Sequence, residues 1–363
     1  MNKKLKNLLL VLGVLTVSLG ALNGCGKKDS AESEDKDYII KVGYYNCDHM
    51  TAAPIAKAAG IYDKLGLKVE LTGNGKVPQA MAAGQMDAGY IGIGNVLNSP
   101  KNNVPLVIGA NNHEGGSYYL VVSNDINEPK DLLGKTLGIG SKPEEDLSWA
   151  TMAKELNIPV EGSNYDAINM NSIQDSYVAL KSGQIKGYTA CDPWGSMAEY
   201  EKVGKIMKEY VGPEGDMGLC CAFTLNKNFV KEHRKLAEKL VQAHVEAIKF
   251  MYEHPVQSSK MFAEAYKVPE EVGLMTIYKK TATIGRTITW KMDEEDAKRE
   301  IKARQDIGSV DKNVKYEDVV DNQLLDELKV EDFDQYIKEK VDPIFPLGMS
   351  YEDWKTKANE IDK

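Results

Sequence analysis

The chain has 363 residues, of which 42% are hydrophobic, 27% charged and 8% aromatic. This ordinary globular composition excludes a wholly disordered, a collagen-like or a polytopic membrane protein, and the length suggests two domains of common size. With 45 Lys and Arg against 54 Asp and Glu, the formal net charge is −9. So acidic a chain argues against nucleic-acid binding, which requires a basic face to meet the phosphates.

The first 24 residues are typical of a signal peptide. Lys3, Lys4 and Lys6 precede an almost entirely apolar run from Leu8 to Leu22. This run is shorter than the roughly 20 residues that a membrane-spanning helix needs. A short apolar run behind a basic amino terminus predicts an export signal.

The end of this segment, Leu22-Asn23-Gly24-Cys25, resembles the bacterial lipoprotein box, although Asn23 is less usual there than Ala or Ser. The resemblance implies cleavage before Cys25 and a diacylglycerol on its thiol, and two acyl chains give lasting membrane attachment. Residues 25–37 are expected to form a flexible tether, because no large apolar side chain follows the cysteine. The protein is expected on the extracytoplasmic face of the cell membrane; a plain secretory peptide and a short anchor helix are the alternatives.

Strand and helix patterns alternate in the first part of the body. Strands are indicated by runs of β-branched and aromatic residues, and helices by apolar residues that recur on one face. The predicted strands are 39–45, 67–71, 88–93, 104–110 and 118–123, with predicted helices at 51–65 and 77–83. This alternation predicts a mainly parallel α/β sheet with helices on both faces.

A second α/β unit follows Pro129, and a helical region follows that unit. The unit has predicted strands at 136–139, 167–170, 185–190 and 220–225, and predicted helices at 145–156 and 173–181. From Val230 the predicted helices are 230–253, 256–265, 270–280 and 293–307, with short pieces beyond and prolines at several boundaries.

An internal repeat connects the two units. Residues 80–90 (AMAAGQMDAGY) recur as residues 179–188 (ALKSGQIKGY). In both copies a predicted helix ends at a glycine, which tolerates the left-handed conformation, and a strand follows at once. Two similar lobes that face each other with the carboxyl ends of their strands enclose a cleft, where ligands of open α/β sheets bind.

Several motifs in order carry a family resemblance. They are Val42-Gly43-Tyr44, the helix with the strand after it at 54–70 (PIAKAAGIYDKLGLKVE), residues 82–90, and Asp192-Pro193-Trp194. Together they resemble the substrate-binding proteins of ABC importers for sulfonates, taurine, nitrate and thiamine-precursor pyrimidines, the NMT1/THI5-like family. The similarity extends from about Ile39 to Leu328.

The resemblance implies a periplasmic-binding-protein type II fold with extra C-terminal helices. Residues 38–129 and 226–363 then form lobe I, residues 130–225 form lobe II, and two crossover segments act as a hinge. It also implies capture of a sulfonate-, nitrate- or pyrimidine-like small molecule by hinge closure, and delivery to an ABC permease and its ATPase. The protein is then a monomer with no cofactor, no nucleic-acid partner and no catalysis of its own.

Candidate ligand contacts come from loops that follow predicted strands or precede predicted helices. Helix amino termini and glycine turns bring backbone N–H groups close to a ligand. The candidates are Tyr45, Asn46, Cys47, Asp48, His49, Gly75, Lys76, Gly92, Asn95, His113 and Gly115 in the first lobe, and Ser141, Lys142, Cys191, Asp192 and Trp194 in the second. Several have an ordinary structural interpretation, since Asp48 can cap a helix, Lys76 can be solvated and Trp194 can belong to the core.

Four further cysteines are unusual in an exported protein. Cys47 and Cys191 are predicted in ligand-facing loops of opposite lobes, and the vicinal Cys220 and Cys221 are expected to be small buried side chains. Disulfides are common outside the cytoplasm, but a Cys47–Cys191 bond would lock the hinge. The alternative is a soft metal, metalloid or organometal ligand, held by these four thiols with His49.

An enzyme of the same fold is a further alternative. Some relatives make pyrimidine precursors with a cysteine-rich loop and a histidine, and Cys47, Cys191 and His49 offer a nucleophile and a base. The chain contains no HExxH, GxSxG or P-loop motif. The export signal and tether favour a binding protein.

Overall fold

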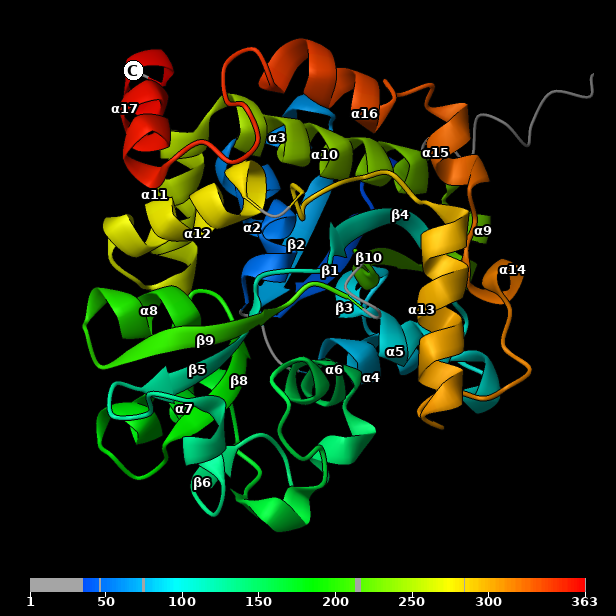
Figure 1. Ribbon diagram of the computed structural model, residues 1–363. Coiled ribbons are helices and arrows are strands. Elements are labelled where there is room, and N and C mark those ends of the chain that lie inside the picture. The colour runs from blue at the N-terminus through cyan, green and yellow to red at the C-terminus, as the bar shows by residue number, and fades with distance from the viewer. Residues whose placement is uncertain (1–34, 46, 74–75, 213–216, 284, 363) are drawn as a thin grey trace, which may run out of the picture. The chain divides into compact units, whose positions relative to one another are not determined.

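Two five-stranded mixed sheets, covered by helices, form the body of this chain (Figure 1). The structure is a computed structural model and describes residues 35–45, 47–73, 76–212, 217–283 and 285–362. The predicted signal peptide, Cys25 and most of the predicted tether lie outside these residues. Residues 39–363 form the unit that carries both sheets. Within the described ranges, no helix combines the length and apolar character needed to cross a bilayer.

The first sheet has the strand order β2-β1-β3-β10-β4. β1 runs parallel to β2 and β3, whereas β10 is antiparallel to β3 and β4. The strands are β1 (Ile39–Tyr44), β2 (Lys68–Gly73), β3 (Ala88–Gly92), β4 (Leu106–Glu114) and β10 (Leu219–Asn226).

The second sheet repeats this arrangement as β7-β6-β8-β5-β9. β6 runs parallel to β7 and β8, and β5 is antiparallel to β8 and β9. The strands are β5 (Tyr118–Ser123), β6 (Thr136–Gly138), β7 (Asp166–Ala167), β8 (Gly187–Cys191) and β9 (Gly204–Tyr210).

The internal repeat predicted from the sequence corresponds to a structural repeat. α4 (Val77–Ala82) leads through Gly84 into β3, and α7 (Ile173–Lys181) leads through Gly183 into β8. Gly84 has φ 66° and Gly183 has φ 77°, so both adopt the left-handed conformation that ends a helix. Each copy supplies the middle strand of its sheet.

Two strands belong to the other sheet than the predicted lobe boundaries imply. β5 was predicted within the first lobe but pairs with β8 and β9 of the second sheet. β10 was predicted within the second lobe but pairs with β3 and β4. The chain therefore crosses between the sheets after β4 and again before β10, and the predicted boundaries at 129 and 225 each fall one strand too late. A strand pattern does not indicate its hydrogen-bond partner, because pairing is not a local property.

Local boundaries differ from the predictions at three places. β4 extends through Glu114, so the polar run from Asn111 is part of a buried strand rather than a loop. The predicted helix 51–65 is two helices, α2 (Ala52–Ala58) and α3 (Ile61–Lys64), because Gly60 between them has φ 68°. Strand β9 was not predicted.

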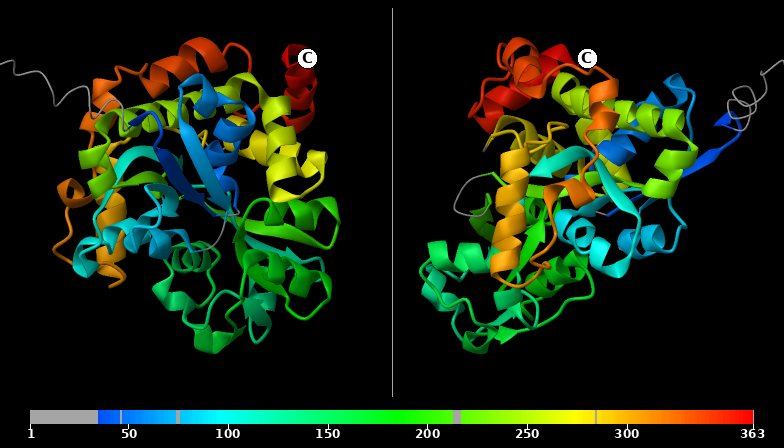
Figure 2. Two further views of the ribbon diagram at one scale, coloured as in Figure 1. Left: turned by 180° about the vertical axis from the view of Figure 1, so that it is seen from behind. Right: turned by 90° about the vertical axis from the view of Figure 1, so that its right-hand side faces the viewer.

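The C-terminal helices cover the first sheet. α10 (Arg234–Glu253) packs against α2 and α3, and α12 (Glu270–Ala282) packs against α11 (Pro255–Tyr266) and α17 (Tyr351–Ile361). In both views of Figure 2 the red C-terminal helix lies on the side of the first sheet. The remaining helices of the α/β part are α5 (Ile93–Leu97), α6 (Leu147–Glu155) and α8 (Trp194–Tyr200). Those of the C-terminal part are α9 (Lys227–Glu232), α10 (Arg234–Glu253), α11 (Pro255–Tyr266), α12 (Glu270–Ala282), α13 (Glu294–Asp306), α14 (Tyr316–Val319), α15 (Gln323–Glu327), α16 (Phe333–Tyr336), a π-helical turn (Ile337–Val341) and α17 (Tyr351–Ile361).

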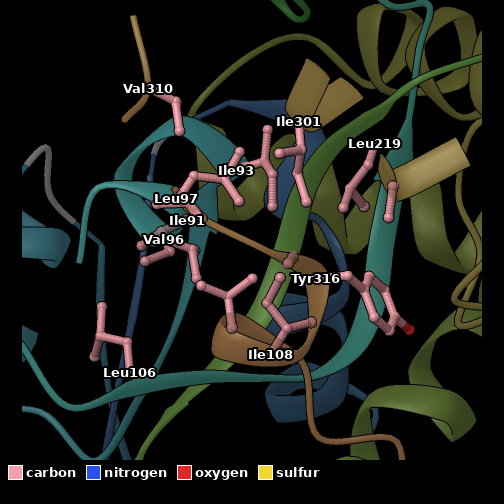
Figure 3. Close-up of a cluster of buried hydrophobic side chains, with 14 of the residues drawn as sticks. Ile91, Ile93, Val96, Leu97, Leu106, Ile108, Leu219, Ile301, Val310 and Tyr316 are labelled. Carbon is pink, nitrogen blue, oxygen red and sulfur yellow. The ribbon is translucent and has the colours of Figure 1, made fainter. Parts of the chain in front are cut away.

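One hydrophobic cluster positions the highly charged helix α13. Its buried Ile301 packs with Ile91, Ile93 and Leu219, as Figure 3 shows. Burying such a side chain contributes roughly 1.5–3 kcal/mol. This packing fixes α13 beside α5 and β10, and thereby sets where its polar residues lie.

A substitution at Gly115, which lies at the first crossover between the sheets, tests the close backbone packing there. Its N–H donates to the carbonyl of Gly218 at 2.8 Å, and a Cβ on Gly115 would lie 1.1 Å from the Val211 carbonyl oxygen. Gly115→Ala is therefore expected to lower the free energy of unfolding by more than about 3 kcal/mol, or to prevent folding. Chemical denaturation followed by circular dichroism measures this.

Gly92→Ala is the matched control, because a Cβ there would meet nothing nearer than 3.9 Å and its φ is −64°. We expect a change within about 1 kcal/mol. Equal stability of the two variants would contradict the close backbone packing at the crossover.

Candidate functional site

A cavity of about 680 Å³ lies between the two sheets. One wall comes from the first sheet: the loop after β1, α5, the start of β10, and α13. The other wall comes from the second sheet: β5, the segments that precede α6 and α7, and the end of β8. The volume falls in the range of roughly 300–1,000 Å³ that small-molecule sites occupy.

Half of the predicted contacts line this cavity. They come from four places in the sequence that the fold brings together: Tyr45, Cys47, His49, Gly92, Asn95, Gly115, Cys191 and Trp194. Cys220 and Cys221, expected to be small buried side chains or metal ligands, line it as well; Cys221 is buried, whereas Cys220 is partly exposed. Trp194 lines the cavity and also packs in the core cluster of the second sheet.

Other predicted contacts lie away from the cavity wall. Lys76 is exposed ahead of α4. Lys142 pairs with Glu145 at 2.7 Å on the surface, and the backbone N–H of Ser141 donates to Asn169 at 3.0 Å. Asn46 and Gly75 lie outside the described residues.

Asp48, Asp192 and His113 are buried behind the wall. Both carboxylate oxygens of Asp192 accept hydrogen bonds from Ser196, at 2.8 Å from the N–H and 2.7 Å from the hydroxyl. The His113 ring stacks on that of His49, with centroids 3.9 Å apart. These residues therefore support the wall rather than face the cavity.

Asp48 connects the two halves of the body. Its carboxylate lies 2.9 Å from the ammonium of Lys280, and both side chains are fully buried. Its backbone N–H donates to the carbonyl of Asp192 at 2.8 Å. Burial raises the pKa of Asp48, and the charges of Lys280 and His49 oppose that rise. α12, which carries Lys280, thus holds a loop that begins more than two hundred residues earlier in the sequence.

Removing Lys280, the nearer of the two cationic groups beside Asp48, should leave a buried carboxylate with only His49 to compensate it. Lys280→Met is expected to reduce the free energy of unfolding by about 3–5 kcal/mol. Asp48→Asn introduced into that variant should recover part of the loss, because an uncharged amide tolerates burial better. Equilibrium unfolding in urea measures both effects.

Lys302→Met provides the control, since Lys302 pairs with Asp306 at 2.8 Å with both side chains largely exposed. An exposed pair contributes at most about 1 kcal/mol. A similar loss in both variants would show that the burial of the Asp48–Lys280 pair does not matter.

Two thiols and an imidazole converge at the cavity, in what we call the thiol–imidazole triad: His49, Cys220 and Cys221. The sulfur of Cys220 lies 3.5 Å from His49 Nδ1, that of Cys221 lies 3.7 Å from the same nitrogen, and the two sulfurs are 3.4 Å apart. Adjacent strand residues normally point to opposite faces. Here β10 changes register against β4 on both sides of Cys221, which brings the two sulfurs together.

A second group joins the two halves across the cavity. Cys47, Asp48 and Cys191 place their side-chain ligand atoms within 4.8 Å of one another. Cys47 follows β1 of the first sheet, and Cys191 ends β8 of the second. Cys47, Cys191, Cys220 and Cys221 are all free thiols. The structure therefore shows no disulfide among the cysteines of the described part of the chain.

The electrostatics of the triad favour a thiolate beside an imidazolium. Burial would lower the pKa of His49, but the negative charges of Asp48, Cys220 and Cys47 raise it to about 10. The hydrogen bond with Cys221 and the charge of His49 hold the pKa of Cys220 well below its usual range, against the effect of burial. The hydrogen bond with Cys220 raises the pKa of Cys221. One thiolate with an adjacent imidazole can bind a soft Lewis acid or act as a nucleophile.

Several polar residues of the cavity were not predicted. Glu300 and Arg304 are paired at 2.7 Å on α13, a helix that was predicted at 293–307 without any part in the site. The others include Asn98 at the end of α5 in the first half. In the second half they lie on strands, at the starts of α6 and α7 or just before these helices, and include Tyr118, Asp146, Ser148, Asn171, Ser172, Gln174 and Tyr210. The i,i+4 spacing of Glu300 and Arg304 was the available signal, but it does not indicate burial.

Comparison with known proteins identifies related sequences and folds. A family model described as NMT1/THI5 like matches residues 47–258. No significantly similar sequence was found among curated proteins.

Three solved structures show the same fold. The zinc-bound ligand-binding component of an ABC-type import system from Staphylococcus aureus is 18% identical, covers 81% of this chain and 99% of its own, and has a TM-score of 0.60. The aliphatic sulphonate binding protein of Escherichia coli is 15% identical, with coverages of 74% and 85% and a TM-score of 0.59. The nitrate-binding protein of Synechocystis is 16% identical, with coverages of 89% and 98% and a TM-score of 0.59. The expected periplasmic-binding-protein fold is confirmed.

Proposed function

This chain belongs to the NMT1/THI5-like family, and from that membership and the cavity between its two sheets we propose that it is the solute-binding component of an ABC importer. It captures a small ligand by closure of two lobes and delivers it unchanged to a permease and its ATPase. The three structural relatives, which their names describe as binding proteins for import, sulfonate or nitrate, support this proposal.

The observation that carries the proposal is the composition of the cavity wall, which both sheets supply. A ligand that touches both walls binds the closed form better than the open form, and this difference in affinity shifts the population towards closure. The two crossovers between the sheets are the covalent connections about which the lobes would turn.

Contacts between α12 and α8 limit the direction of that motion. Lys279 on α12 donates to the hydroxyl of Ser196 and the carboxylate of Glu199 on α8, each at 3.0 Å. Figure 1 shows these two helices side by side, and Val272 of α12 belongs to the core cluster of the second sheet. Closure is thus expected to bring α13 and α5 towards the α6 side, away from this contact.

The charges of the wall bear on the class of ligand. Among the described residues that line the cavity, the one guanidinium or ammonium group belongs to Arg304, and Glu300 already pairs with it. A sulfonate or nitrate would therefore find no unpaired Lys or Arg on this part of the wall. An uncharged heterocycle such as a pyrimidine, or a soft ligand for the thiols, fits the wall better.

Ligand capture should make the protein more compact. The solute that co-purifies is identified by native mass spectrometry and added back to the emptied protein. Small-angle scattering is expected to show a smaller radius of gyration, and the melting temperature should rise. If neither changes with this solute, or with sulfonates, nitrate, pyrimidines or thiophilic metal ions, capture by closure is wrong.

The aromatic wall of the cavity provides a variant for the same measurement. Trp194→Ala should weaken binding about tenfold, whereas Tyr200→Ala should not, because Tyr200 is exposed at the end of the same helix. Recovery of a chemically altered solute would instead favour an enzyme, for which the neighbouring Cys220 and His49 offer a nucleophile and a base.

A lipid on Cys25 is proposed to hold the protein on the extracytoplasmic face of the membrane. The expected result for Cys25→Ser is release from the membrane fraction into the soluble fraction, with unchanged solute affinity. Fractionation of cells that express each form measures this. Retention of the variant in the membrane would favour an uncleaved anchor helix.

A further inference from the structure

We propose that the thiol–imidazole triad binds a thiophilic d10 metal ion, such as Zn(II), Cu(I) or Cd(II), as the solute that this protein captures. The inference rests on the proposed function and names the ligand class for the same cavity. Sulfur and imidazole donors favour such ions over Mg²⁺, Ca²⁺ or Mn²⁺, which prefer oxygen.

The spacing of the three donor atoms matches one face of a tetrahedral site. With metal–sulfur bonds of about 2.3 Å and metal–nitrogen bonds of about 2.0–2.1 Å, a tetrahedron has nitrogen–sulfur edges of about 3.6 Å and a sulfur–sulfur edge of about 3.8 Å. The observed edges are 3.5 and 3.7 Å from Nδ1 to the two sulfurs, and 3.4 Å between the sulfurs. A metal ion fits this face with shifts of a few tenths of an ångström.

The surroundings of His49 orient the nitrogen that a metal needs. Its other nitrogen, Nε2, lies 3.1 Å from the carbonyl oxygen of Ser117. In the tautomer that donates this hydrogen bond, Nδ1 carries the lone pair and faces both sulfurs. Asn112 also donates to the His49 carbonyl at 2.5 Å and holds the backbone of the loop. Such outer hydrogen bonds are typical of histidines that bind metals.

His113 is a second, independent sign of a missing ligand. It is fully buried, and among the described residues its ring nitrogens meet no hydrogen-bond partner of normal geometry, only the nearby thiol of Cys220. One of these nitrogens lies with His49 and Cys220 in a group of ligand atoms within 4.8 Å of one another. A buried imidazole without a normal hydrogen bond is costly, so a bound metal that draws this ring inward would offset the cost.

Two further thiols line the same cavity as the triad. Cys47 and Cys191 both line the cavity and come from opposite sheets. A metal held by the first sheet could thus be covered by the Cys191 side as the lobes close. Binding of a divalent ion to two thiols releases up to two protons to solvent and changes no oxidation state.

Titration of the metal-free, reduced protein with Cd(II) tests this inference. We expect one equivalent to bind, with a thiolate-to-cadmium charge-transfer absorption and a smaller radius of gyration in scattering. Cys220→Ser and Cys221→Ser should each weaken binding at least tenfold and reduce the absorption. Tyr200→Ala, at an exposed residue outside the cavity lining, should bind as the parent does.

A measurement on the unaltered protein tests the same site even if the cysteine variants fail to fold. Cys220 is partly exposed, and Cd(II) should protect it from alkylation, as mass spectrometry of the modified peptides would show. Binding that is unaffected by both cysteine variants, or equal alkylation with and without Cd(II), would overturn the metal site.

The outcomes separate this inference from the proposed function. Compaction with an organic solute but no binding of Cd(II), Zn(II) or Cu(I) overturns the metal site and leaves the proposed function standing. Cd(II) binding at the triad without compaction supports the site but contradicts capture of the metal by closure of the lobes.

Discussion

The buried ion pair between Asp48 and Lys280 is the contact on which the geometry of the site depends. A carboxylate removed from water must have a cation beside it, and here that cation comes from α12, far along the chain. The pair holds the loop after β1 in place, and the N–H of Asp48 joins that loop to Asp192 in the other half. His49 and Cys47 flank Asp48 in the sequence, so the same contact places an imidazole and a thiol at the cavity.

Strand exchange explains why the cavity has two different walls on one chain. Each sheet receives one antiparallel strand from the chain as it crosses over, β5 in the second sheet and β10 in the first. The crossovers run backbone against backbone, which Gly115 permits because it has no Cβ. The two crossovers are thus the covalent connections between the sheets about which the proposed closure would turn.

Thiol and imidazole donors, rather than unpaired charged side chains, distinguish the chemistry of the cavity wall. Arg304 is neutralised by Glu300, while four thiols surround one end of the cavity. The irregular pairing of β10 with β4 turns two consecutive cysteines towards the same imidazole. A regular strand would have directed one of them to each face, and the triad would not exist.

The α/β class, the repeated helix–glycine–strand unit and half of the predicted contacts that line the cavity follow from the sequence alone. These are local properties: apolar periodicity, the left-handed glycines at 84 and 183, and the position of Cys47, Gly92, Cys191 and Trp194 after strands or before helices. Three features appear only in the folded chain: the sheet that β5 and β10 join, the pairing of Lys280 with Asp48, and the meeting of Cys220 and Cys221 with His49. The reason is physical, because strand pairing, ion-pair partners and the register of a bulge depend on residues distant in sequence, and no local pattern of β10, α12 or α13 contains them.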